Sequence, residues 1–117
     1  MSQFLYLYRM TPTSRQNAMG TPEAAQQSMQ KWMTWLADLE TRGHLKDRGQ
    51  PLEQGGKVVK GPKAVSDGPY AEAKDVIGGY SIVEARDIDQ AVELSQGCPI
   101  LGGDGSVEVR PVMKMDY

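Results

Sequence analysis

The sequence predicts an α+β domain in the split βαβ, or ferredoxin-like, arrangement. The first observation is the order of the predicted elements, which is strand, helix, strand, strand, helix, strand. The second is that both predicted helices begin at an N-cap signal and carry an apolar stripe. The third is that the two strands expected at the centre of the sheet are apolar on both faces. With 117 residues, the chain suits one domain spanning residues 1–117.

The N-terminal half predicts one strand and one long helix. Residues 4–8 are rich in aromatic side chains and favour a strand. Residues 10–20 are polar and predict a loop. Thr21 is a good N-cap and Pro22 suits the first helical position, so we expect a helix to begin there. Gly43 is typical of the left-handed residue that follows a helix.

Apolar side chains recur along this helix at steps of three and four residues, which predicts a stripe facing the core. Trp35 lies at the edge of the stripe, where we expect it to cover an opening or a subunit contact. The stripe itself consists of Ala25, Met29, Trp32, Met33, Leu36 and Leu39.

The rest of the chain completes the predicted sheet. Residues 44–66 hold two prolines and short apolar runs, and predict a strand or an irregular hairpin at a sheet edge. Residues 76–85 predict a strand, in which two adjacent glycines indicate a bulge or a close approach by another backbone or a ligand. Asp87 and Gln90 form a capping-box-like pair that begins the second helix. Residues 106–113 alternate cleanly and predict the last strand.

Both predicted central strands are apolar on their two faces. Two helices can cover only one face of the sheet, and a monomer rarely exposes more than a few hundred Å² of continuous apolar surface. A second copy packed sheet against sheet would cover the other face. We therefore predict a homodimer through the helix-free face, whose two sheets form a barrel-like interior, a dimeric α/β-barrel. On the first strand one side carries Phe4, Tyr6 and Tyr8, and the other Leu5 and Leu7. On the second, one side carries Val76, Tyr80 and Ile82, and the other Ile77, Val83 and Ala85.

The composition argues against several classes of protein. A net charge of -2 and a pI near 5.3 disfavour nucleic-acid binding, which needs a basic face. No apolar run approaches the ~20 residues that span a bilayer, and the N-terminus lacks a signal-peptide pattern, so we expect a cytoplasmic protein without a membrane partner. No histidines recur at metal-ligand spacing, and we expect neither a metal nor a cofactor. The single cysteine, Cys98, is expected to be a semi-buried thiol.

The turn Asp67-Gly68-Pro69-Tyr70 is the main candidate for chemistry. Asp67 either caps the turn through its side chain or, in a cleft that excludes water, has a pKa raised far enough for a general base. Tyr70 either packs against its neighbours or orients a ligand. Lys74 lies in the charged connector that follows, and its pairing with Asp67 would argue against a base.

Four further residues complete the candidate site. His44 is the only histidine and follows the first helix, where its charge suits the negative helix end. It is also a candidate catalytic partner of Asp67 across the sheet edge or a dimer interface. Arg9 and Arg110 lie at or near strand ends, and either bind an anionic ligand group or remain surface charges. Tyr6, on the first strand, is a further candidate ligand-binding residue.

Three segments of the chain resemble the DGPF branch of the YCII-related family. They are DGPYAEAKDVIGGY (67–80), AVELSQGCP (91–99) and GSVEVRPV (105–112). The resemblance implies a dimeric α/β-barrel of ferredoxin-like subunits, in which Asp67 matches the aspartate of the motif and Tyr70 replaces the usual phenylalanine. In the wider family a histidine and an aspartate near the barrel mouth are proposed as acid and base. That histidine lies within the first helix of the related branch, whereas His44 follows the helix here. Proteins of the DGPF branch are often encoded beside extracytoplasmic-function sigma factors, which implies a sigma-factor-type partner.

These residues and the resemblance leave two functions open. The first is a cofactor-independent enzyme with lyase- or isomerase-like acid–base chemistry, in which Asp67 acts on a small molecule in a dimer-interface pocket. His44, Tyr70 or Arg110 would assist it. The second is a non-catalytic regulatory or accessory module that binds a metabolite or a sigma-factor-type partner. A concave pocket that holds an unpaired Asp67 favours the enzyme, and a solvent-facing Asp67 locked by its own turn argues against it.

Overall fold

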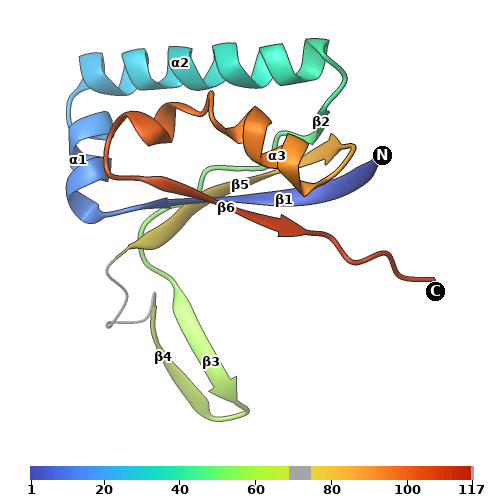
Figure 1. The fold of residues 1–117 in the computed structure, drawn as a ribbon. Coiled ribbons are helices and arrows are strands. Elements are labelled where there is room, and N and C mark those ends of the chain that lie inside the picture. The colour runs from blue at the N-terminus through green and yellow to red at the C-terminus, as the bar shows by residue number, and fades with distance from the viewer. Residues whose placement is uncertain (69–74, 117) are drawn as a thin grey trace.

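The structure is a computed structural model that describes residues 1–68 and 75–116, and it has the predicted mixed α and β architecture (Figure 1). Within these residues, a four-stranded antiparallel sheet has the order β2-β5-β1-β6. The central strands are the predicted pair, and the strand bounds are β1 (Ser2–Met10), β2 (Leu45–Asp47), β5 (Val76–Ala85) and β6 (Ser106–Pro111).

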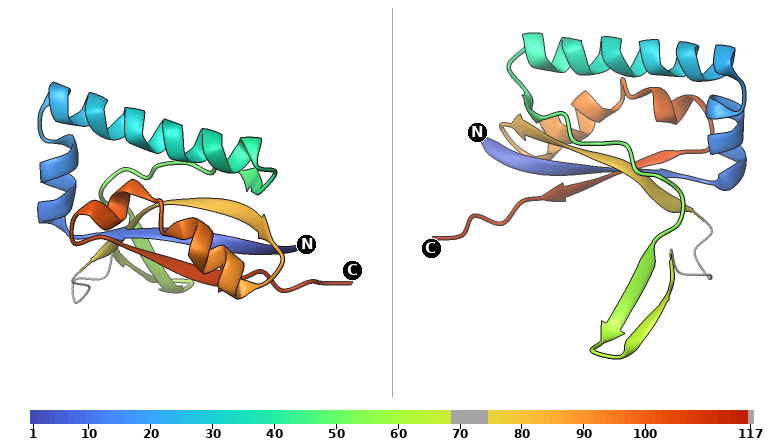
Figure 2. Two further views of the ribbon diagram at one scale, coloured as in Figure 1. Left: turned by 45° about the horizontal axis from the view of Figure 1, so that its top comes forward. Right: turned by 180° about the vertical axis from the view of Figure 1, so that it is seen from behind.

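The two predicted helices are α2 (Pro22–Thr41) and α3 (Ile88–Ser95), and both lie on the same face of the sheet (Figure 2). Their caps confirm the sequence signals. The hydroxyl of Thr21 accepts a hydrogen bond from a backbone N–H of the first turn of α2, and Gly43 follows its end with φ +80°. Asp87 Oδ1 accepts from the Gln90 N–H at 2.9 Å and begins α3. The capping-box arrangement therefore satisfies backbone donors at the start of α3.

Residues 10–20 are not the loop that their polarity predicts. They contain α1 (Pro12–Met19), whose N-cap Thr11 accepts a hydrogen bond from the Ser14 N–H at 3.1 Å. The Thr11-Pro12 pair repeats the signal that starts α2 ten residues later. None of the residues in α1 is buried, so the helix lacks the apolar stripe by which helices are usually found.

Residues 44–66 do not form one element at the sheet edge. After β2, the chain runs beside β5, where Pro51 bridges Gly79 and the Leu52 N–H donates to Gly78 O at 2.8 Å. Strands β3 (Lys57–Gly61) and β4 (Ala64–Asp67) then form a separate two-stranded hairpin that projects away from the main sheet (Figure 1 and Figure 2). Gly55 and Gly56, with φ +87° and +143°, precede the hairpin and permit the change of direction.

The glycine pair in β5 forms the predicted bulge. Tyr8 lies opposite Gly79 but Arg9 lies opposite Ile77, so Gly78 is the extra residue. Because of this extra residue, the residues of β5 that precede Gly78 lie on the face of the sheet opposite to the one that strict alternation predicts. Ile77 was predicted to share a face with Val83, and instead it lies on the open face opposite Arg9, with 37% of its surface exposed.

The core lies between the sheet and the helices, and α2 faces it at an angle different from the predicted one. Trp35 is buried at 8% exposure rather than lying at the edge of the stripe. Met29 and Met33, which the stripe places in the core, are 62% and 52% exposed. The core residues are Phe4, Tyr6, Tyr8, Trp35, Leu39, Val83, Ala85, Ala91, Leu94 and Cys98.

Candidate functional site

A large cavity lies between α1, α2, the sheet and the segment of residues 48–52. Its volume is about 470 Å³. We call it the Met/Trp cavity, because methionines and Trp32 form much of its wall. The apolar and aromatic residues that line it are Tyr8, Met10, Ala18, Met19, Met29, Trp32, Met33, Leu36, Pro51, Leu52, Tyr80, Pro99 and Ile100.

Small residues of β5 leave this space empty. Gly78, Gly79 and Ser81 all line the cavity, and the two glycines contribute no side chain to fill it. A Cβ on Gly79 would lie 3.1 Å from Gln50 O, so the close approach of the 48–52 segment requires a residue as small as glycine there. The cavity therefore follows from the same glycine pair that creates the bulge.

The cavity has a fixed polar group where it meets the sheet. The hydroxyl of Tyr8 donates to Ser81 Oγ at 2.8 Å, and Ser81 Oγ donates to Arg48 O at 2.6 Å. Burial raises the pKa of the Tyr8 hydroxyl well above its ordinary value, although the hydrogen bond with Ser81 opposes the shift. Tyr8 therefore stays protonated at neutral pH and orients Ser81 rather than acting as a base.

Aromatic packing holds the other wall in place. The rings of Trp32 and Tyr8 meet edge to face with centroids 4.6 Å apart, and Trp32 meets Trp35 in the same manner at 5.8 Å. Such pairs stabilise one another beyond their area of contact. Trp32 therefore presents a defined surface to the cavity, in contrast to the flexible methionines beside it.

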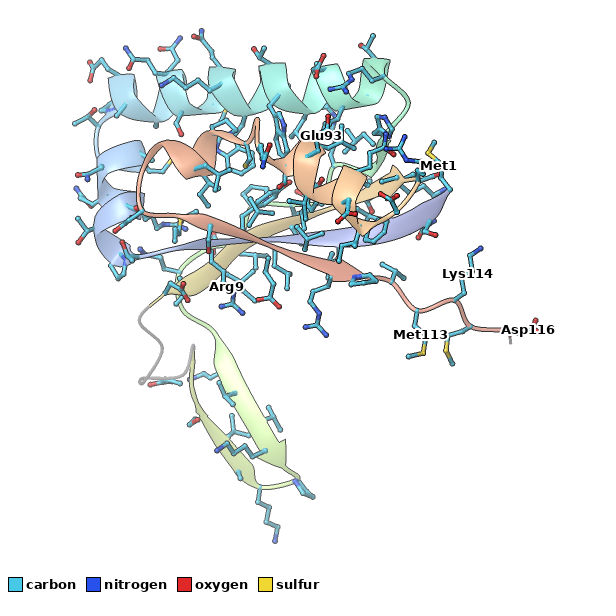
Figure 3. All side chains as sticks on the ribbon, viewed as in Figure 1. Met1, Arg9, Glu93, Met113, Lys114 and Asp116 are labelled. Carbon is cyan, nitrogen blue, oxygen red and sulfur yellow. The ribbon has the colours of Figure 1, made fainter. Side chains whose placement is uncertain are left out.

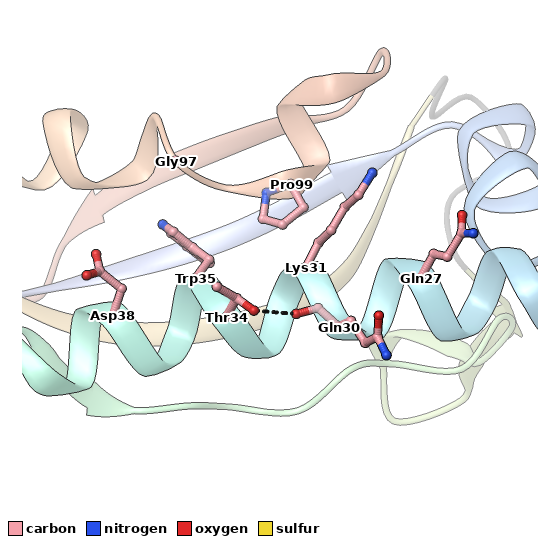
Figure 4. Close-up of a pocket in the computed structure, with 8 residues that line it drawn as sticks. All are labelled: Gln27, Gln30, Lys31, Thr34, Trp35, Asp38, Gly97 and Pro99. Atoms are coloured by element: carbon pink, nitrogen blue, oxygen red, sulfur yellow. Dashed lines mark hydrogen bonds between the residues drawn. The ribbon is translucent and has the colours of Figure 1, made fainter.

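A second depression lies between α2 and the stretch Gly97–Pro99 (Figure 4). Most of its lining side chains are polar and exposed, and Trp35 is the buried one. The Thr34 hydroxyl donates to Gln30 O at 2.9 Å, and Asp38 pairs with Arg42 at 3.3 Å. Because its polar side chains face water, this groove is a weaker candidate for ligand binding than the Met/Trp cavity.

The predicted acid–base residue lies on the hairpin, at the end away from its tip. Asp67 ends β4, its side chain is 89% exposed, and it pairs with Lys57 on β3. Its carboxylate is therefore neutralised and hydrated within one subunit. Tyr70 and Lys74 lie outside the described residues.

The structure does not bring His44 and Asp67 together within one subunit. His44 Nδ1 lies 2.8 Å from Glu84 O, to which it donates, and the His44 N–H donates to Leu39 O at 2.8 Å. Glu84 is near the end of β5, whereas Asp67 precedes the start of that strand. His44 thus joins the end of α2 to the sheet, which is a structural role.

The other predicted ligand-binding residues lie away from the cavity. Arg9 is on the open face of the sheet (Figure 3), where its Nε donates to Glu108 at 2.9 Å and its guanidinium pairs with Asp75 at 3.4 Å. Arg110 pairs with the same Glu108 at 3.3 Å. Tyr6 is fully buried in the core, and its hydroxyl donates to Ala91 O. The cavity is lined by none of these residues, nor by His44 or Asp67.

Two features of the sequence form part of the cavity wall, although their patterns predict a core stripe for one, and a bulge or a close approach by a backbone or a ligand for the other. One is the run of methionines on α2, and the other is the glycine pair in β5.

Cys98, the lone thiol, is 3% exposed, and burial raises its pKa to about 12, so it is not a nucleophile at neutral pH. Within residues 1–68 and 75–116, no three metal-ligating side chains gather closely enough to hold an ion, and no helix is long and apolar enough to span a bilayer.

The model of the YCII-related domain matches residues 4–116. The chain belongs to the YCII-related family. The match covers the sheet from residue 4 onward, its helices and the Met/Trp cavity, so this site lies within the family domain. No curated protein matches the chain.

Proposed function

We propose that this YCII-related protein binds a small, mainly apolar molecule in the Met/Trp cavity. The observation that supports the proposal is the cavity itself, about 470 Å³ of space with a mostly apolar wall and a few fixed polar groups. Cavities of roughly 300–1,000 Å³ with this character are where proteins commonly bind small molecules. The methionines allow the wall to adapt to the shape of a ligand.

A neutral fluorescent probe, N-phenylnaphthylamine, tests this proposal. We expect saturable binding with energy transfer from Trp32, which lines the cavity. Ser28→Phe places a ring in the cavity from α2 and should abolish binding. Gln26→Phe adds the same ring on an exposed position of α2 outside the cavity, and should leave binding unchanged. No saturable binding, or equal binding by both variants, would contradict the proposal.

The proposal includes a homodimer formed through the open face, and membership of the DGPF branch on the strength of the Asp67 motif. On the open face, Leu7 lies opposite Tyr80 and Leu5 opposite Ile82, and these side chains are only partly buried in one subunit. Covering them with a second copy would bury apolar surface at the centre of the sheet. Sedimentation should give the mass of a dimer for the wild type and of a monomer for Leu7→Lys. A wild-type protein that sediments as a monomer would contradict the proposed dimeric barrel.

A second candidate function is acid–base catalysis at Asp67, which the Asp-Gly-Pro-Tyr motif favours. Since Asp67 is exposed and paired with Lys57 in one subunit, this function requires a partner subunit to cover the hairpin and displace Lys57. A thermal-shift screen of metabolites that compares the wild type with Asp67→Asn tests it. A metabolite that stabilises only the wild type supports the base, and equal shifts exclude Asp67 from the site.

The accessory alternative, with a sigma-factor-type partner, is favoured by the exposed hairpin. Val59 and Val65 are 66% and 56% exposed, and isolated hairpins are marginally stable in water. Replacing both valines by serine should abolish co-purification with a sigma factor and preserve binding of the neutral probe. If the variant still co-purifies with the sigma factor and still binds the neutral probe, the hairpin is not a protein-binding surface.

A further inference from the structure

The charged residues that line the Met/Trp cavity are of one sign. Arg15 from α1 and Arg48 from the 48–52 segment both line it, and no carboxylate does so among the residues that the structure describes. Arg15 Nη1 donates to Leu52 O at 3.3 Å, and Arg48 lies in the same segment as Leu52. The Arg15 guanidinium therefore borders the cavity at the 48–52 segment, whereas the partners of the Arg48 guanidinium are on α2.

The two arginines differ in how far they are already neutralised. Arg48 pairs with Glu40 at 3.2 Å, and its guanidinium also lies 3.7 Å from Met33 Sδ. Arg15 has a neutral carbonyl as its partner among the described residues, at a long hydrogen-bond distance. A guanidinium has five N–H donors, so Arg15 retains donors for a further acceptor. Arg15 is thus the cation of this site that lacks a carboxylate within the described part of the chain.

We propose that the ligand of the Met/Trp cavity is an apolar molecule with one anionic group, such as a carboxylate, which Arg15 binds. This inference rests on the proposed function, because it specifies the ligand of that same cavity. An apolar wall strengthens the attraction between a guanidinium and an anion, and guanidinium matches the planar geometry of a carboxylate. The methionines and Trp32 hold the apolar body of the ligand, and Arg15 fixes its orientation.

Two probes with the same aromatic scaffold test the inference. Anilinonaphthalene sulfonate carries an anionic group, and N-phenylnaphthylamine does not. We expect Arg15→Gln to weaken binding of the sulfonate by about tenfold, the effect of losing one charged hydrogen-bonding partner, and to change binding of the neutral probe by less than about twofold. Arg48→Gln should weaken the sulfonate less, because Glu40 already pairs with Arg48.

Arg42→Gln is the matched control, since it removes the same charge from an exposed residue outside the cavity, and it should leave both probes unchanged. Circular dichroism establishes that each variant is folded. If Arg15→Gln weakens both probes equally, or neither, the anionic ligand is wrong while the cavity remains a binding site. If the wild type binds neither probe, or Ser28→Phe binds both normally, the proposed function itself fails and this inference fails with it.

Discussion

The two halves of the space beneath α2 are built differently, although one helix covers both. In one half, Trp35 and Leu39 are buried in the core cluster that also contains Tyr6 and Val83. In the other half, Met29, Trp32 and Leu36 line the Met/Trp cavity. The difference comes from β5. Its residues Val83 and Ala85 fill the first half with side chains, whereas Gly78 and Gly79 have no side chain to fill the second. The packed half therefore stabilises the fold, and the hollow half has the space that the proposed ligand requires.

The largest effect should come from a matched pair of leucines on α2. Leu39 is 1% exposed in the packed half, and Leu36 lines the cavity in the hollow half. We expect Leu39→Ala to lower the free energy of unfolding by about 2–5 kcal/mol, because it leaves a void in a packed core. Leu36→Ala should cost about 1 kcal/mol, since Leu36 already borders empty space. Urea denaturation measures both, and equal losses would break the distinction between the halves.

A smaller effect is expected from the hydrogen-bonded pair that separates the two halves. Ser81→Ala leaves the buried Tyr8 hydroxyl without its acceptor and should cost about 1–3 kcal/mol. Tyr8→Phe removes the donor but leaves the Ser81 bond to Arg48 O intact, and should cost about 1 kcal/mol. The double variant should lose less than the sum of the two, by thermal or urea unfolding. Strict additivity would show that the bond between Tyr8 and Ser81 contributes nothing.

The packed half was the easier one to predict. Helices α2 and α3 begin or end at residues with one clear conformational role, which are Thr21, Gly43 and Asp87. Their apolar periodicity then fixed most of the core. These are local signals, and local signals determine where helices and strands begin.

The hollow half depends on pieces that lack such periodicity. Helix α1 carries the same Thr-Pro signal as α2 but no apolar stripe, and its polar sequence predicts a loop. The 48–52 segment is held by backbone hydrogen bonds to Gly78 and Tyr80, which side-chain patterns do not report. A methionine on a helix stripe has the same sequence signature in a core and in a cavity wall. The candidate residues Asp67 and His44 were chosen by chemistry alone, and tertiary structure places them apart.

The open face provides the smallest expected effect, because the ion pairs that Glu108 forms there are partly exposed to water. Hydrogen bonds from Arg9 first, and from Arg110 second, lower the pKa of Glu108 below its ordinary value. A lowered pKa in the folded state means that Glu108 stabilises the fold above its unfolded pKa of about 4.3, and that this stabilisation disappears as the pH falls through the folded value. Glu108→Gln should therefore lose less stability than the wild type between about pH 6 and about pH 3.

Urea midpoints at the two pH values measure the difference, and Glu93→Gln is the control. Glu93 is an exposed carboxylate on α3, on the side of the sheet opposite Arg9 (Figure 3), so its replacement should leave the pH dependence of the wild type nearly unchanged. The effect of Glu108→Gln should be small, because exposed ion pairs are screened by water and salt. It should also shrink as salt is added. If Glu108→Gln and Glu93→Gln show the same pH dependence, Arg9 and Arg110 do not stabilise the Glu108 carboxylate.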